Sequence, residues 1–472
     1  MGSFQDDLGL RWRFVSVFAI ALSTILPAIP VFAYAQEAPE LACRVEPVVF
    51  EGWQAQQLSN SWVRLVIVPQ LGGRVMQVYF DGHPYLFVNP QYKGQYLPPS
   101  EVTAKHRWFN YGGDKIWPMP EGDQDEHHWP GPISDPLDDG NYVFKVLSAA
   151  PSCRVRLDGP RDPKTGLQYS REITLESDSP EIRFHAIMKN IADHSIQWSM
   201  QSVTQYDTND SKQPGDYNRD FWAFTPANPN SSYLARYHVC SGLADDPSLR
   251  IGEGLFSLHW LPLENEVWLD STTGWVAVVD AASQYGMVEH FQYAQAGEYP
   301  GKATVIFYKN GSAIEMNEQG FPVLTSSQPD EALRYMEAEL NSPIVTLAPG
   351  QTYAMDTEWN PVRVGRDLTA VSDAGVCDAV LQATHAPQGA RLRGSFGVFF
   401  PGHLEAQLLD PQGVKLASVP LQSVSPNRAT KLDQTILAPD GATDVSIHLI
   451  DAHGKDRGTL GAVKITPGGK NP

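Results

Sequence analysis

Alternation of apolar and polar residues runs through most of this chain and constrains its fold more than any other feature. The segments "WVRLVIVP" at residues 62–69 and "RVMQVYFDG" at residues 74–82 show the two-residue period of half-buried strands. Gly, Pro, Asn and Asp separate such segments, and helical periodicity is scarce. About eighteen short strands precede residue 365, too many for one small sandwich. We therefore predict an all-β fold whose main domain has two large sheets.

The composition changes between residues 361 and 372. No Trp follows Trp359, although the chain has 12 Trp in total. The later runs "HLEAQLLDPQGVKLASVPL" and "DVSIHLIDAHGKDRGTLGAVKI" each read as two strands joined by a turn, at residues 410–413 and 451–455. We predict a large domain over residues 40–365 and a smaller immunoglobulin-like β-sandwich over residues 372–472, with a structural or spacer role.

The N-terminal segment differs from the rest of the chain. Two Arg precede an apolar run over residues 14–32, which ends in the small-residue pattern "AYA" at residues 33–35. This pattern predicts a signal peptide over residues 1–35 and a mature chain that starts near Gln36. We therefore expect an exported protein, periplasmic or secreted, without stable membrane insertion after cleavage of the signal.

The charge balance excludes some partners. The formal net charge is -19, from 54 acidic and 35 basic residues, so the surface repels nucleic acid phosphates. We find no nucleophile elbow, P-loop, dinucleotide-binding fingerprint or His-Glu-x-x-His motif. We predict no nucleic acid partner and no cofactor.

Four cysteines remain after the predicted signal: Cys43, Cys153, Cys240 and Cys377. An even number in an exported protein permits two disulfides, with three possible pairings, and buried free thiols fit the sequence equally well. None of the spacings resembles a CxxC motif, so we predict a structural role.

Several motifs in the large domain occur in a particular order. The segment "LVIVPQLGGRVMQVYFDGHPYLFVNP" places Gly72, Gly73 and Arg74 between two strands and leads to Asn89. The segments "NYGGDKIWPMP", "EIRFHAIMKN" and "YMEAELNSPIVTLAPGQTYAMDTEW" follow. Over residues 45–362 this order resembles the galactose mutarotase-like (aldose 1-epimerase-like) superfamily. A bacterial branch of that superfamily also shares the Trp-Pro and "D-x-G-x-Y" elements at residues 129–130 and 138–142. The resemblance implies a β-supersandwich of two antiparallel sheets with a carbohydrate cleft.

The segment "YMEAELN" supplies candidate catalytic carboxylates. Its two-residue period puts Tyr335, Glu337 and Glu339 on one face and the apolar residues on the other. Sugar mutarotation needs a base for the anomeric hydroxyl and an acid for the ring oxygen. The resemblance implies Glu337 as the base, with Glu339 as the second candidate. A solvated strand face is the alternative explanation for this pair.

The acid of the family is a His, and this sequence departs from that pattern. The family positions read "FNYGGD" and "QWSMQSVTQYD" here, with Asn110 or Tyr111 and Ser199 or Gln201 where His is expected.

Two other histidines are candidates for the acid. His106 precedes the Gly-Gly loop and His128 lies within it, so we name both as substitutes for the family His. His185, on a strand, is predicted to be a structural or surface residue.

The loop at residues 110–132 and its flanking strands supply the predicted sugar-binding residues. Trp117 and Trp129 are candidates for stacking on a sugar ring. Arg74 could reach a sugar hydroxyl or a carboxylate. The complete predicted substrate-binding set is Arg74, Asn110, Asp114, Lys115, Trp117, Trp129 and Gln201.

Charges in and near this loop suggest two further possibilities. Arg74, Lys105, Arg107 and Lys115 form a basic cluster that fits an anionic sugar such as a uronate, although solvated loop cations are the commoner case. The run "EGDQDEHH" at residues 121–128 has metal-ligand types without a standard spacing, so we predict no metal site.

The favoured interpretation is an exported, carbohydrate-binding, carbohydrate-active protein whose partner is a sugar or oligosaccharide. If it is an enzyme, it is an aldose 1-epimerase-like isomerase that uses a Glu base and a His acid. Two alternatives remain: a non-catalytic glycan-binding protein, for which the missing His argues, and a polysaccharide lyase or hydrolase, for which the basic cluster argues. The sequence leaves the oligomeric state open.

Overall fold

The regular structure of this protein is almost entirely β-strand. The computed structural model describes residues 43–97, 108–122, 127–132, 136–311, 313–316, 322–324 and 333–467. In these residues the helices are short, namely α1 (Pro136–Asp139) and a 3-10 turn at Pro300–Lys302, and none has the length and apolar character to cross a membrane. The predicted all-β fold is confirmed. The predicted signal peptide and His106 lie outside the described residues.

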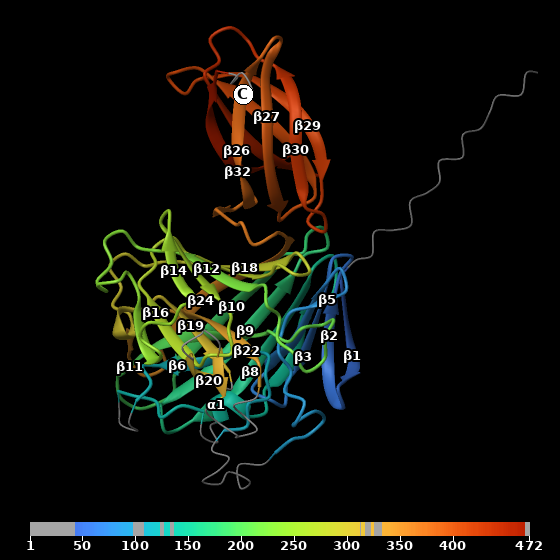
Figure 1. Ribbon diagram of the computed structural model, residues 1–472. Helices are drawn as coiled ribbons and strands as arrows, with labels where there is room; N and C mark the ends of the chain where they lie inside the picture. Colours follow the sequence, from blue (N-terminus) through green and yellow to red (C-terminus); the bar gives the residue numbers. More distant parts are fainter. Residues whose placement is uncertain are drawn as a thin grey trace, which may run out of the picture. The chain divides into compact units, whose positions relative to one another are not determined.

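The first large sheet has twelve strands (Figure 1). Neighbours on its main path are antiparallel and run in the order β1 (Arg44–Phe50), β2 (Trp53–Ser59), β3 (Val63–Val68), β4 (Arg74–Phe80), β6 (Asp114–Met119), β11 (Ile196–Asp207), β22 (Tyr335–Asn341), β19 (Val305–Asn310), β16 (Asn265–Leu269) and β13 (His238–Gly242). Two short strands pair at its side, β5 (His83–Pro84) with β4 and β23 (Val345–Leu347) with β11. This order brings strands from distant parts of the sequence next to β22.

The second large sheet has ten strands. Its antiparallel order is β14 (Leu249–Gly252), β15 (Leu255–His259), β12 (Phe221–Pro226), β17 (Trp275–Asp280), β18 (Tyr285–Phe291), β24 (Thr352–Arg363), β10 (Ile182–Asn190), β9 (Leu167–Leu175), β8 (Cys153–Asp162) and β7 (Val143–Ser148). Strands β20 (Ala313–Met316) and β21 (Pro322–Leu324) form a separate pair.

One hydrophobic core joins the two large sheets. Met336 and Leu340 of β22 belong to the same buried cluster as Phe184 of β10 and Trp359 of β24. The predicted two-sheet architecture is therefore confirmed.

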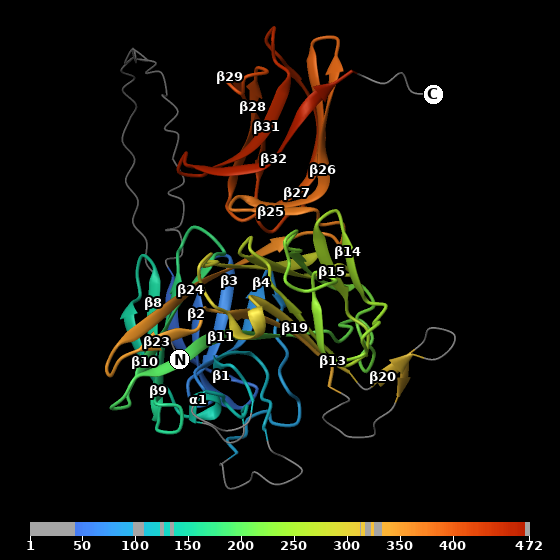
Figure 2. The same cartoon turned by 90° about the vertical axis from the view of Figure 1, so that its left-hand side faces the viewer.

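The C-terminal strands form an eight-stranded sheet of their own, drawn in orange to red in Figure 2. Its main path is β29 (Lys415–Val424), β28 (Gly402–Leu409), β31 (Asp444–Asp451), β32 (Asp456–Thr466), β26 (Gly375–Ala386), β27 (Gly389–Val398) and β30 (Thr430–Leu437), and β25 (Ala370–Ser372) pairs with β26. The two predicted hairpins are confirmed, since β28 pairs with β29 and β31 pairs with β32. The predicted domain boundary itself stays a prediction.

A disulfide bond connects the two large sheets. Cys43, just before β1, bonds to Cys153, the first residue of β8, with 5.5 Å between their Cα atoms. Cys240 is an exposed thiol and Cys377 a buried one. The structure thus contains one bridge and two free thiols in its described part, and not two disulfides.

A glycine pair sets the close approach of β4 to helix α1. Gly72 and Gly73 have φ angles of 66° and 63°, in the left-handed region that favours glycine. A Cβ at Gly72 would lie 1.8 Å from the carbonyl oxygen of Asp138, and one at Gly73 would lie 2.9 Å from the Tyr142 ring. This contact brings the start of β4, at Arg74, beside Asp138.

Candidate functional site

A pocket of about 250 Å³ lies on the face of the twelve-stranded sheet that points away from the core. Strands β6, β11, β22, β19 and β16 form its floor. Its aromatic lining consists of Trp108, Trp117, Trp268, Tyr308 and Tyr335. Its carboxylates are Glu121, Glu266, Glu337 and Glu339.

Strand register assembles this lining. Glu337 pairs with Tyr308 on β19, and Tyr308 pairs with Glu266 on β16. Directly opposed residues of antiparallel strands share a face, so these three side chains form a row across the sheet. Tyr335 and Glu339 line the same pocket, whereas the alternate residues Met336, Ala338 and Leu340 lie in the core. The predicted orientation of β22 is confirmed.

Glu337 is held by two donors from neighbouring strands. Its Oε1 accepts a hydrogen bond from Lys115 Nζ at 3.1 Å and one from Gln205 Nε2 at 2.7 Å. Lys115 is buried, and its Nζ lies 4.5 Å from the centre of the Trp117 ring. Burial lowers the pKa of Lys115, and the charge of Glu337 opposes that effect. Glu337 is therefore the carboxylate of the pocket that a cation supports.

Glu339 has a different environment. Its Oε2 accepts a hydrogen bond from Gln201 Nε2 at 2.6 Å, and only 7% of the residue is exposed. Burial raises the pKa of Glu339 well above its usual range, and the charges of Glu337, Glu266 and Glu121 raise it further. Two carboxyl groups of one strand thus have different surroundings, since Glu337 pairs with a cation and Glu339 does not, which suits them to base and acid roles.

The other two carboxyl groups also hold protons more tightly than usual. Trp268 Nε1 donates to Glu266 Oε1 at 2.5 Å. Burial raises the pKa of Glu266, and the charge of Glu337 adds to this. Part of Glu121 reaches solvent, yet desolvation in the pocket, together with the charges of Glu266 and Glu337, raises its pKa to about 7.

Asp138 of helix α1 holds two aromatic residues of the pocket wall, Trp108 and Trp117. Its Oδ1 accepts from Arg74 Nη2 at 2.6 Å and from Trp117 Nε1 at 2.7 Å, and its Oδ2 accepts from Trp108 Nε1 at 3.0 Å. Arg74 is completely buried and also donates to the carbonyl of Gly112 at 3.1 Å. Arg74 therefore supports the wall and does not line the pocket.

Three other predicted binding residues lie outside the lining. Asp114 is completely buried, pairs with Arg171 of β9 and thus faces the ten-stranded sheet. The carbonyl of Asn110 accepts from Asn89 Nδ2 at 2.8 Å, and Asn110 is not among the lining residues. Trp129 is completely buried, with its ring 5.4 Å from that of Trp117. Of the predicted binding set, Trp117 and Gln201 line the pocket, and Lys115 contacts it through Glu337.

The structure does not bring His128 into the pocket. A Cβ at Gly122 would lie 3.1 Å from the His128 ring, which places this His beside the chain just after Glu121 and not in the lining. Among the described lining residues there are four Glu and no His, Lys or Arg. The predicted His acid is therefore not in the described part of the pocket.

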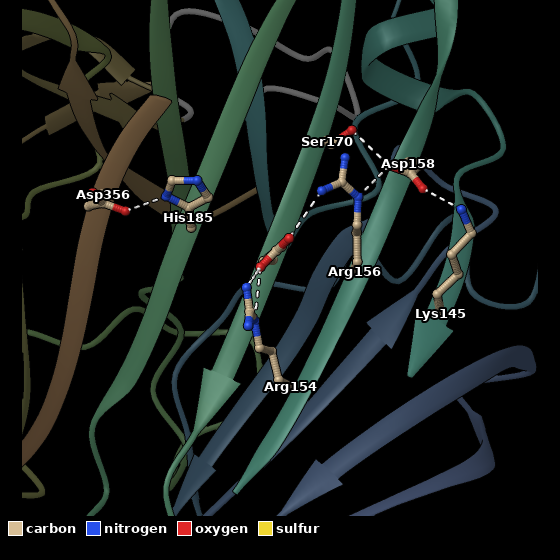
Figure 3. A network of polar contacts seen from close by, with 8 residues as sticks. Lys145, Arg154, Arg156, Asp158, Ser170, His185 and Asp356 are labelled. Carbon is tan, nitrogen blue, oxygen red and sulfur yellow. Dashed lines mark hydrogen bonds and ion pairs between the residues drawn. The ribbon is translucent and has the colours of Figure 1, made fainter. Parts of the chain in front are cut away.

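A second hollow, of about 620 Å³, lies on the ten-stranded sheet, where charged side chains pair with one another (Figure 3). Arg154 and Arg156 of β8 both contact Glu172 of β9. His185 Nδ1 lies 2.7 Å from Asp356 Oδ1, and both side chains are exposed. The prediction that His185 is a surface residue is confirmed, and the matched charges leave this face a weaker candidate site.

Folding buries and pairs the described members of the predicted basic cluster. Lys105 and Arg107 lie outside the described residues, while Arg74 and Lys115 are buried and paired with Asp138 and Glu337. Within the described ranges, no group of three or more His, Cys, Asp or Glu side chains has a metal-binding arrangement.

The sequence patterns did not single out six residues of this site: Trp108, Glu121, Asp138, Glu266, Trp268 and Tyr308. The run "NEVWLD" does alternate Glu266 and Trp268 on one strand face, but any surface strand can do so. Asp138 belongs to the "D-x-G-x-Y" element, which carried no role in the sequence.

Comparisons with known proteins find distant structural similarity and no matching family. No model of a known protein family matches this chain. A TPR-domain containing protein from Parabacteroides distasonis matches at 14% identity and TM-score 0.42, over 68% of this chain and 53% of that one, so this chain spans about half its length. A galactose mutarotase-like protein from Clostridium acetobutylicum (10% identity, TM-score 0.42, 68% of this chain and 99% of that one) is similar. A putative mutarotase from Salmonella typhimurium matches at 9% identity and TM-score 0.43, over 68% of this chain and 94% of that one. Galactose mutarotase-like proteins are thus among the structures this chain resembles, as its motifs predicted, and TM-scores near 0.4 leave its function to be argued from the pocket.

Proposed function

We propose that this protein binds a sugar in the pocket on β22 and interconverts its anomers by acid and base catalysis. The observation that carries the proposal is the pair Glu337 and Glu339, two residues apart on one strand, in one aromatic pocket but in different environments.

The pocket suits a single sugar ring. Its volume of about 250 Å³ is just below the range of roughly 300–1,000 Å³ that is usual for drug-sized ligands. Aromatic faces such as those of Trp108 and Trp268 pack against the C–H faces of sugars, while Gln201 and the carboxylates offer hydrogen bonds to hydroxyls.

The reaction follows from the two environments. Glu337, which accepts hydrogen bonds from Lys115 and Gln205, takes the proton of the anomeric hydroxyl. The C1–O5 bond breaks as Glu339, which keeps its proton because of its raised pKa, donates that proton to the ring oxygen. The open-chain aldehyde rotates about C1–C2. Ring closure on the other face reverses both proton transfers and restores the two carboxyl groups.

This mechanism keeps the predicted base, Glu337, and assigns the acid to Glu339 in place of a His. The reason is physical, because a carboxyl group that burial and neighbouring charges keep protonated can serve as an acid near neutral pH.

Polarimetry or one-dimensional NMR of freshly dissolved sugars tests the proposal. The protein should accelerate mutarotation, and Glu337→Gln and Glu339→Gln should each lower the rate at least roughly 100-fold. Glu46→Gln, a change on the exposed edge strand β1, is the matched control and should keep the rate. No acceleration with any aldose, or an unchanged rate in both pocket variants, would contradict the proposal.

Binding without chemistry is the second candidate, because no described His lines the pocket. A glycan array would then show binding that Trp108→Ala abolishes, while NMR shows no anomer exchange. Trp108 is the better variant here because Trp117 is almost completely buried. The lyase or hydrolase alternative rested on the basic cluster, whose described members are buried and paired.

We also propose that the protein is exported. The Cys43–Cys153 bond supports this, because disulfides persist in oxidising compartments. Cell fractionation and N-terminal sequencing test it, with a mature chain expected to start near Gln36. A full-length chain that stays in the cytoplasm would contradict this localisation.

A further inference from the structure

We propose that the preferred ligand is a cationic sugar, an amino sugar with a free ammonium group, which Glu121 and Glu266 hold. This inference rests on the proposed function, because it takes the sugar pocket as given and names the class of sugar.

The charge of the pocket is the first argument. Its described lining contains four carboxyl groups and no cationic side chain. Lys115 is buried next to the lining and pairs with Glu337. An ammonium group favours the ionised form of these carboxyl groups and pairs with it, whereas the carboxylate of a uronate would add like charge.

Unpaired oxygens in the floor are the second argument. Glu339 uses Oε2 for Gln201, and across the described ranges its Oε1 has no hydrogen-bond partner, although the residue is only 7% exposed. Glu337 likewise uses Oε1 for both of its donors and leaves Oε2 without one in the described part of the chain. Both residues line the pocket, so these oxygens are the acceptors that remain for a polar ligand there.

The position of Glu121 and Glu266 gives the ammonium its place. Glu121 and Glu266 line the same pocket, and the charge of each raises the pKa of Glu339. Among the charges that act on Glu121, that of Glu266 has the largest effect. Glu266 lies two strands from Glu337, with Tyr308 between them. A sugar ring over Glu337 and Glu339 can therefore direct a substituent to Glu266 and Glu121.

Aromatic rings favour the same cation. Trp268 adjoins Glu266 through its Nε1, and Tyr308 lies between the two acidic positions. Ring faces attract ammonium groups, and desolvation strengthens that attraction. The Nζ of Lys115 already lies over the Trp117 ring in this way.

Binding of an ammonium should depend on pH. Burial and the charges of Glu266 and Glu337 raise the pKa of Glu121 to about 7, and the charge of Lys115 opposes this rise. Burial and the charge of Glu337 raise the pKa of Glu266, while hydrogen bonds from Trp268 and Cys240 and the charge of His238 oppose that rise. An ammonium favours the ionised carboxylates, so its binding releases protons. The affinity should therefore rise from pH 5 to pH 7.

Calorimetry with defined sugars tests the inference. Glucosamine, glucose and N-acetylglucosamine are titrated into the full chain at pH 7, with tetramethylammonium as a cation that is not a sugar. We expect glucosamine to bind at least tenfold more tightly than either neutral sugar, and its affinity to fall at pH 5.

Variants then test the assigned residues. Glu266→Gln should reduce the ratio of glucosamine to glucose affinity toward one, whereas Glu46→Gln should leave that ratio unchanged. Because a ratio of two ligands is compared within one variant, a general loss of folded protein does not mimic the effect.

The outcomes separate this inference from the proposed function. If neutral sugars bind as tightly as glucosamine and their anomers are interconverted, the inference of an amino sugar is wrong. The proposed mutarotase function then still holds. If tetramethylammonium binds as tightly as glucosamine, the pocket recognises a cation and not a sugar, and the inference of an amino sugar is wrong. No binding and no turnover of any sugar overturns both proposals.

Discussion

At the scale of single residues, Asp138 fixes two aromatic side chains of the pocket although it does not line the pocket itself. It neutralises the completely buried Arg74 and accepts hydrogen bonds from the indole nitrogens of Trp108 and Trp117. A carboxylate with three donors fixes the orientation of all three. The pocket therefore depends on a residue that is not part of its lining.

Removing this charge should destabilise the protein. Asp138→Asn leaves Arg74 buried without a counter-ion, and we expect a loss of about 3 kcal/mol in the free energy of unfolding. Urea denaturation followed by Trp fluorescence measures it.

A double variant is the control for this change. Arg74→Met combined with Asp138→Asn removes both charges and should recover part of the loss. Equal stability of the wild type and the single variant would contradict the role of the ion pair.

At the scale of elements, the turn before β4 sets how closely that strand meets helix α1. Gly72→Ala would place a Cβ 1.8 Å from the carbonyl oxygen of Asp138. Gly82, at the other end of β4, has a φ of 81° but open space around its Cβ position.

These two glycines form a matched pair for experiment. Both alanine variants place a side chain at positive φ, and only Gly72→Ala adds a clash. We expect Gly72→Ala to lose roughly 1–3 kcal/mol more stability than Gly82→Ala, as measured by urea denaturation. Equal losses would show that the contact with α1 has no energetic weight.

A buried polar cluster joins the two large sheets. Tyr206 donates to Glu289 Oε1 at 2.6 Å, and Thr204 lies within 3.4 Å of both Asp114 and Glu289. Burial raises the pKa of Glu289 to about 8. Glu289 thus keeps its proton in the folded protein up to that pH.

This shift predicts how stability depends on pH. Between the unfolded pKa of about 4.3 and the folded value, unfolding releases the proton, so stability falls by up to about 1.4 kcal/mol for each pH unit. Glu289→Gln should remove this contribution, so that the variant gains on the wild type as the pH rises from 5 to 8. Urea denaturation at both pH values measures it, and parallel pH profiles of the two proteins would refute the assignment.

At the scale of the whole molecule, the Cys43–Cys153 bond closes a long loop across both large sheets. The two cysteines are 110 residues apart in the sequence. A cross-link over a loop of this length limits the unfolded chain strongly, which stabilises the folded state.

Loss of the bond should therefore be costly. Replacing Cys43 and Cys153 together by Ser should lower the free energy of unfolding by roughly 4 kcal/mol. Cys240→Ser, at an exposed free thiol, is the control and should change little. Denaturation without reductant compares the three proteins, and a double variant as stable as the wild type would argue against the bridge.

The sequence by itself was sufficient for the fold class and for the direction of β22. Alternation is a local property, because successive side chains of a strand point to opposite faces whatever the partner strand is. For this reason Glu337 and Glu339 could be assigned to one face, opposite Met336, before any strand pairing was known. The hairpins of the C-terminal sheet were equally local.

Only the tertiary structure decided which side chains share the pocket. Glu266 and Tyr308 stand beside Glu337 because β16, β19 and β22 pair in a register that depends on contacts between distant segments. Folding likewise paired Arg74 with Asp138 and buried both, although loop cations usually face solvent. Strand pairing and side-chain burial depend on packing between distant segments, and local periodicity carries no information about that packing.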